Sequence, residues 1–321
     1  MENTSYESQG FISGLIGDGR PLLSFTGLAL GISGAVCLFL SLTGSFLPQD
    51  VSFLGMQPEQ LCAIHQCRVV HFMFHDRVSF GGALLSIATF YLWLANFPLK
   101  ARESWAWWTF TISGGMGFLS FLCYLGYGYL DTWHGVATLA LLPLFLTGLY
   151  QSRKHLDGNR SCSCLFLDFH PFEIRTAYGL GRCFLMMTAL GQVAAGAVIM
   201  SVGMTSVFVP EDLIYLQLSR DQVSAINQHL IPLIAHDRAG FGGAIFSCGI
   251  LLAMIILKAR PSRHLWEAIC LSGGVGFACA IGVHFCIGYL NPTHIAPAFA
   301  GLGLFSLGMA LTYRRTHQVK A

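Results

Sequence analysis

Two short stretches of this sequence place three ionisable residues side by side among apolar ones. The first, "HDRVSFGG", begins at His75, and the second, "HDRAGFGG", begins at His236. The chain is 54% hydrophobic and only 11% charged, so such clusters are conspicuous. Ionisable side chains inside apolar membrane segments are costly and usually mark function. The candidate site therefore contains both triplets: His75, Asp76, Arg77, His236, Asp237 and Arg238.

Two further histidines recur in the same way. His134 ends "GYLDTWH" and His294 ends "GYLNPTH". Asp131 and Asn291 are natural helix N-caps, and Pro292 suits the first helical position, so each histidine falls in the first turn of a helix. We expect His75 to lie at the depth of His134, and His236 at the depth of His294.

Three chemistries use two buried histidines at one depth. One is bis-histidine ligation of haem b, with Arg77 and Arg238 anchoring its anionic groups. Another is a divalent metal site in each half of the chain, bound by His75 and His134 or by His236 and His294, with Asp76 or Asp237 completing the ligand set or orienting the imidazoles. The third is proton or substrate binding without a metal, because histidine titrates near neutral pH. Three adjacent helical residues spread over about 200°, so they cannot all face one ligand.

A purely structural role is compatible with these chemistries. Asp76 could pair with Arg238, and Asp237 with Arg77, which would fasten the two halves of the chain together. The glycines that follow each triplet also have two interpretations. They could let helices approach a flat macrocycle, or they could serve the close helix packing that is common in membranes.

The elements that position these residues are long apolar segments. Eight of them are long enough to cross a hydrocarbon core of about 30 Å as helices. They cover 22–46, 72–97, 105–129, 132–150, 183–207, 233–257, 266–289 and 293–313. The segments are continuously apolar rather than alternating, which favours helices over a β-barrel. The sequence thus predicts an all-α integral membrane protein with eight transmembrane helices.

The second half of the chain repeats the first. "SGGMGF" at 113–118 matches "SGGVGF" at 272–277, and "LPQD" at 47–50 matches "VPED" at 209–212. We predict two tandem four-helix repeats, 22–150 and 183–314, joined by a linker at 151–182 and flanked by tails at 1–21 and 315–321. Four spans are an even number, so both repeats enter the membrane in one orientation, in parallel pseudo-two-fold symmetry.

The basic residues predict the orientation. Of 18 Lys and Arg residues, only Arg68, Arg77, Arg220 and Arg238 flank one face, and all the others flank the opposite face. By the positive-inside rule, both tails and the linker are cytoplasmic, as in a bacterial inner membrane, and the repeated histidines lie at the outer face.

The loops after the first and fifth spans are long and amphipathic. Ser219 and Gln222 form a capping-box pattern, and Pro58 suits a first helical position, so each loop should contain a short helix. Cys62 and Cys67 stand five residues apart there and cannot pair on a helix unless the chain bends. The histidines that the halves do not share are expected to be peripheral: His65, His71, His229 and His284.

These patterns lead to three functional hypotheses. The first is a membrane redox protein that binds haem or metal, with its reductant supplied by a quinone of the lipid bilayer in its reduced form. The second is a transporter or channel for a small solute, with the triplets as its outer gate. The third is a structural membrane subunit. The sequence has no basic run typical of nucleic-acid binding and no nucleotide-binding or hydrolase motif.

Overall fold

Long apolar helices make up most of the computed structural model, which describes residues 14, 16–120, 129, 132–158, 160–165 and 169–318. None of these described residues forms a strand. The helices of the first half are α2 (Arg20–Leu42), α3 (Pro48–Leu54), α4 (Pro58–Cys62), α5 (Arg68–Asn96), α6 (Ser104–Ser120) and α7 (Thr132–Lys154). Those of the second half are α8 (Ala177–Met204), α9 (Pro210–Leu216), α10 (Arg220–Ile226), α11 (Leu230–Lys258), α12 (Arg263–Ile287) and α13 (Pro292–His317).

Seven of these helices are long and apolar enough to cross a membrane: α2, α5, α7, α8, α11, α12 and α13. The chain is therefore an all-α integral membrane protein, as the sequence predicts. The segment expected to span at 105–129 corresponds to α6, of which 17 residues are described. The rest of that expected span lies almost entirely outside the described residues, so the eighth span stays a prediction.

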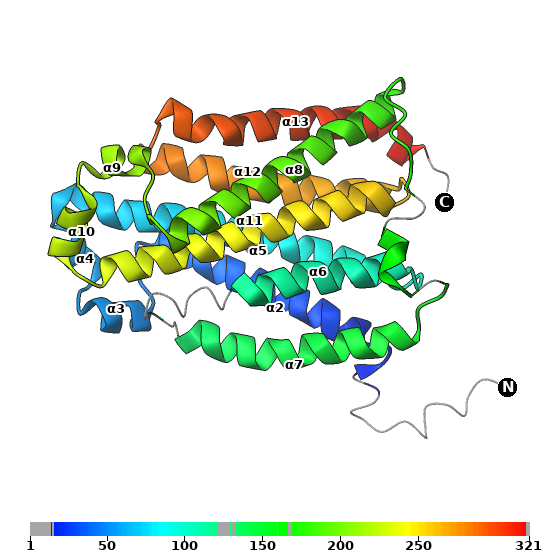
Figure 1. Cartoon of the computed structure of the whole chain (residues 1–321), viewed down its shortest axis with the longest axis horizontal. Coiled ribbons are helices and arrows are strands. Elements are labelled where there is room, and N and C mark those ends of the chain that lie inside the picture. The colour runs from blue at the N-terminus through cyan, green and yellow to red at the C-terminus, as the bar shows by residue number, and fades with distance from the viewer. Residues whose placement is uncertain are drawn as a thin grey trace.

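The long helices form one bundle with α5 and α11 at its centre (Figure 1). These two helices pack on each other, and each is buried along most of its length. Around them, α5 also contacts α2 and α12, while α11 contacts α8 and α6. The short helices α3, α4, α9 and α10 gather at one end of the bundle (Figure 1). The start of α2 and the end of α13 lie at the other end.

The glycine pair after each triplet serves close packing. Gly81 faces the backbone of Gly34 on α2, and a Cβ at Gly82 would stand 2.5 Å from the Cβ of Cys279 on α12. The corresponding Gly242 faces Gly196 on α8, where an added Cβ would collide with the backbone of that helix. A side chain at these positions would push the helices apart. Of the two interpretations of these glycines, the structure supports packing.

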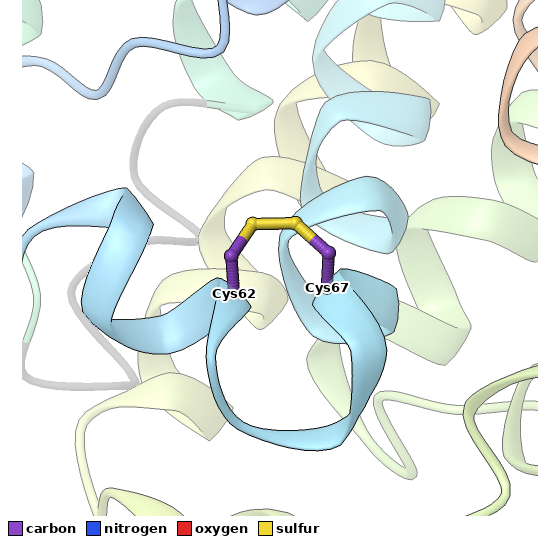
Figure 2. The surroundings of a disulfide bond; sticks show 2 residues. All are labelled: Cys62 and Cys67. Carbon is purple, nitrogen blue, oxygen red and sulfur yellow. A yellow bond between two sulfur atoms is a disulfide. The ribbon is translucent and has the colours of Figure 1, made fainter.

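The short helices begin as predicted, but the segment around Cys62 and Cys67 does not stay helical. Pro58 is in the first turn of α4, and the Ser219 hydroxyl accepts a hydrogen bond from Gln222 N. The chain then leaves α4 after Cys62 and turns sharply through residues with positive φ, ending at Cys67. This bend brings the two sulfurs together in a disulfide (Figure 2). No turn signal in the sequence indicates the bend, so the pairing of these cysteines was not predicted.

Candidate metal centre

Both triplets lie towards the end of the bundle that carries the short helices. His75 comes seven residues after α5 begins at Arg68, and His236 comes six residues after α11 begins at Leu230. Pro232 is therefore the third residue of α11, which begins before the apolar segment expected at 233–257. The backbone carbonyl of Asn227, just before the helix, accepts a hydrogen bond from Leu230 N. A proline is tolerated anywhere in the first turn, where its missing N–H costs nothing.

The two predicted ion pairs both form. Arg238 Nε lies 3.1 Å from Asp76 Oδ2, and Arg77 Nε lies 2.7 Å from Asp237 Oδ2. All four side chains are buried or nearly so. The pairs join α5 to α11, and thus one half of the chain to the other. The reciprocal pairing expected from the sequence is therefore present.

Each arginine also has a second carboxylate partner, which the sequence pattern did not identify. Arg77 Nη1 lies 2.8 Å from Asp50 Oδ2, and Arg238 Nη1 lies 2.6 Å from Asp212 Oδ2. A guanidinium flanked by two carboxylates has no remaining charge to neutralise. The structure thus gives each arginine a protein partner in place of the anionic ligand group expected from the sequence.

Asp50 and Asp212 are held by the short helices α3 and α9. Each stands at the third helical position after a proline at the first, and its Oδ2 accepts a hydrogen bond from the backbone N–H before the helix, Leu47 N or Val209 N. The signal was present in the sequence, because "LPQD" and "VPED" recur with the same spacing. An acidic residue in the first turn of a helix also commonly acts as a cap, so only the tertiary structure shows that Asp50 and Asp212 are buried against arginines.

A tyrosine hydroxyl donates a hydrogen bond to the second oxygen of each of these carboxylates. Tyr129 donates a hydrogen bond to Asp50 Oδ1 at 2.5 Å, and Tyr289 donates one to Asp212 Oδ1 at 2.8 Å. Burial, together with the negative charge of Asp212, raises the pKa of Tyr289 far above its ordinary value. Tyr289 therefore stays a hydrogen-bond donor at any physiological pH, and it keeps the carboxylate of Asp212 oriented towards Arg238.

Three histidines lie close together beside the ion pairs that Arg238 forms with Asp76 and Asp212. His75 Nε2 lies 3.0 Å from His284 Nε2, and the ring centroid of His294 is 5.8 Å from that of His75 and 5.2 Å from that of His284. Within the described part of the chain, they are the one group of three potential ligands whose binding atoms all lie within 4.8 Å of one another. His75 and His284 are buried, and His294 is half-buried.

The hydrogen-bond partners of this histidine cluster determine where the protons lie. Nδ1 of His284 is 2.6 Å from the carbonyl oxygen of Ala280, which can only accept, so that nitrogen carries a proton. Nδ1 of His75 is 2.9 Å from Asp76 Oδ1, a carboxylate that also accepts. If both rings are neutral, each presents an unprotonated Nε2 to the other. Two lone pairs 3.0 Å apart repel each other, so this contact requires a cation, either a proton shared in a hydrogen bond or a metal ion bound by both nitrogens.

The histidines meet across the two halves of the chain and not within each half. His75 of the first half lies with His284 and His294, while His134 lies 5.3 Å from His236 between ring centroids. The sequence-based expectation was different, since it grouped His75 with His134 and His236 with His294. The reason is helix packing, because α5 contacts α12 of the second half and α11 contacts α6 of the first.

His284 was wrongly expected to be peripheral. Its counterpart in the first half is a tyrosine at 124, which lies outside the described residues, so the repeat pattern argued against a role for it. It stands one turn before the end of α12, where the helix passes α5. For His294, the expected cap is present, since Asn291 Oδ1 accepts hydrogen bonds from Thr293 N and His294 N. The corresponding cap at Asp131 lies outside the described residues.

No family model matches this chain, and no curated protein or solved structure is significantly similar to it.

Proposed function

We propose that this integral membrane protein binds a transition-metal ion through His75, His284 and His294. The observation that carries the proposal is the 3.0 Å separation of two Nε2 atoms whose rings both use their Nδ1 proton elsewhere. Two nitrogens bound to one ion at about 2.0–2.1 Å lie about 2.8–3.4 Å apart when the bond angle is about 90–109°. The observed separation falls within this range, and a third imidazole lies within reach.

The same distance favours an ion over haem. Two axial histidines of a haem lie on opposite faces of the macrocycle, separated by about twice a metal–nitrogen bond, or roughly 4 Å. A separation of 3.0 Å leaves no room for a porphyrin between these rings. Imidazole ligands suit zinc, copper and iron ions. A copper or iron ion would serve the redox role that the sequence suggests.

Asp76 and its partners support the metal ligands. Asp76 accepts from His75 Nδ1, which fixes the tautomer and the orientation of that ring. Its other oxygen is held by Arg238, which Asp212 holds in turn. The ion pairs between the halves and the support of the metal ligands are thus parts of one network. Removal of such an outer carboxylate typically lowers metal affinity by about 10–100-fold.

The proposal places this site at the outer face of the membrane. The distribution of Lys and Arg supports it, and so does the disulfide between Cys62 and Cys67, because such bonds persist in oxidising compartments. The distribution of Lys and Arg and the position of the disulfide are both consistent with two four-helix repeats in parallel orientation, with α6 as the core of an eighth span. In this arrangement the tails and the linker are cytoplasmic.

Elemental analysis of purified protein, with His236→Ala as the matched control, tests the proposal. His236 has the same sequence context and similar burial as His75, but it lies in the other histidine pair. We expect about one equivalent of metal in the wild type and in His236→Ala, and a loss of metal in His75→Ala and His284→Ala. Metal-free wild-type protein, or equal metal content in all four proteins, would exclude the site.

A visible spectrum distinguishes the two cofactor classes in the same samples. Haem gives an intense Soret band that shifts on reduction with dithionite, whereas a trihistidine metal site gives none. A Soret band that disappears in His75→Ala would replace the proposed ion by haem.

A further inference from the structure

A cavity of about 140 Å³ lies beside the other histidine pair, inside the bundle. It is bounded by α2, α5, α6, α7 and α11, and His134 is part of its wall. Most of the wall is apolar and includes the rings of Phe80 and Phe118. An apolar cavity of about 150 Å³ holds one benzene-sized ring. The size and the lining therefore fit a single six-membered ring.

The cavity wall also carries hydroxyl groups, and their protons are already used. Thr26, Ser33, Ser113 and Ser120 each donate to a carbonyl oxygen of their own helix, and Ser247 donates to the carbonyl of Ser113 on α6. Tyr91 Oη lies 3.0 Å from Ser113 Oγ, and it must be the donor there because the proton of Ser113 faces Thr109 O at 2.8 Å. These hydroxyls therefore present only acceptor lone pairs to the cavity, whereas Thr138 and the imidazole of His134 supply donors to the same wall.

Acceptors outnumber donors in this wall, and such a wall favours a ligand that donates hydrogen bonds. A ring with two carbonyl oxygens could accept from His134 or Thr138 but would leave the acceptors without a donor, whereas a ring with two hydroxyl groups can both accept and donate. We propose that this cavity binds the dihydroxy-aromatic ring of a membrane-soluble quinol, in preference to the oxidised quinone. The inference rests on the proposed function only for the transfer of electrons from the bound quinol to the metal ion. The binding itself involves none of the three proposed metal ligands.

The surroundings of His134 suit this ligand. Its ring lies 5.3 Å from that of His236, whose Nδ1 is 3.1 Å from Asp237 Oδ1. Asp237 contacts Arg77, and Arg77 contacts Asp50. A row of protonatable and charged groups thus extends from the cavity wall towards the short helices at the end of the bundle. Two of the walls, α2 and α7, are outer helices that expose large apolar side chains, so the bilayer lies one helix away.

Gly117 offers a direct way to fill the cavity. It lines the cavity, and a Cβ added there meets nothing within 4 Å. Gly117→Leu therefore places a new side chain in the space meant for the ring, and its Cβ meets no atom of the neighbouring helices. Gly115→Leu is the matched control, because it adds the same side chain to the same helix, also in open space, but not in the cavity wall.

Equilibrium dialysis of the purified protein with three probes tests the inference: a decyl hydroquinone, its dimethyl ether and the corresponding quinone. We expect the hydroquinone to bind at least about tenfold more tightly than the other two, since each leaves buried acceptors without a donor. Gly117→Leu should lose this binding, and Gly115→Leu should retain it. Equal affinity for hydroquinone and dimethyl ether, or unchanged binding to Gly117→Leu, would overturn the inference.

The metal content of the same variants separates this inference from the proposed function. Gly117→Leu should keep the wild-type metal content, which shows that it is folded. If the wild type binds quinol but no metal, the proposed metal centre fails and the quinol site stands. If it binds metal but shows no preference for quinol, the quinol inference fails alone.

Discussion

Replacement of Arg238 tests whether two carboxylates share one buried guanidinium. Arg238 contacts Asp76 at 3.1 Å and Asp212 at 2.6 Å. Two unit charges about 4 Å apart attract by about 4 kcal/mol at an effective dielectric constant of about 20. Arg238→Met removes both attractions and leaves two unpaired buried carboxylates. Loss of one partner from a single buried pair costs about 3–5 kcal/mol, so we expect a loss of at least about 4 kcal/mol in unfolding free energy.

The second replacement makes the prediction specific. Asp212→Asn alone removes one of the two charges but leaves Arg238 paired with Asp76, so it should cost about 1–3 kcal/mol. In the Arg238→Met background the same change removes a stranded charge and should restore part of the lost stability. The double mutant should therefore be more stable than the sum of the single effects predicts, by about 2 kcal/mol.

The assay is unfolding in mixed micelles with increasing SDS, followed by circular dichroism, for the wild type, both single mutants and the double mutant. Additive effects, within about 0.5 kcal/mol, would refute the shared guanidinium. A charge swap, Asp76→Arg with Arg238→Asp, gives an independent check. It should fail to restore stability, because an aspartate at 238 would face Asp212 without a cation between them.

Two further predictions concern packing and orientation. Gly242→Ala should lower the unfolding free energy by about 1–3 kcal/mol in the same assay, because its Cβ would press on the backbone of α8, whereas Gly274→Ala, in open space, should be nearly neutral. In intact cells, a membrane-impermeant maleimide should label Cys62 and Cys67 only after treatment with an impermeant reductant. Failure to label after reduction would contradict the outer-face assignment of that end, and labelling before it would contradict the disulfide.

Repetition within the sequence was enough to predict much of the charge network. Asp76, Arg77, Asp237 and Arg238 recur at matching positions, and opposite charges in an apolar environment have a strong reason to pair. Their reciprocal pairing was therefore predictable. Asp50 recurs with its counterpart too, but an acidic residue in the first turn of a helix usually serves as a cap in water, so its burial against Arg77 was not predictable from sequence.

The identity of the histidine cluster depended on how helices pack. Helical periodicity fixes the direction of His75 relative to its own helix, but it does not say which neighbouring helix that direction faces. Because Gly82 leaves room for Cys279, α5 packs closely against α12, and this packing places His284 beside His75. His284 has no counterpart histidine in the first half, so no pattern in the sequence indicated it.

The sequence by itself determined that the chain is a helical membrane protein with buried, reciprocal charges. These features follow from local quantities, namely the length of apolar segments and the cost of an unpaired charge in a membrane. Only the tertiary structure decided that His75, His284 and His294 converge, and that Cys62 meets Cys67 across a bend. Both contacts depend on how closely helices can approach one another and where the chain can turn. These are determined by side-chain packing between segments that are distant in the sequence.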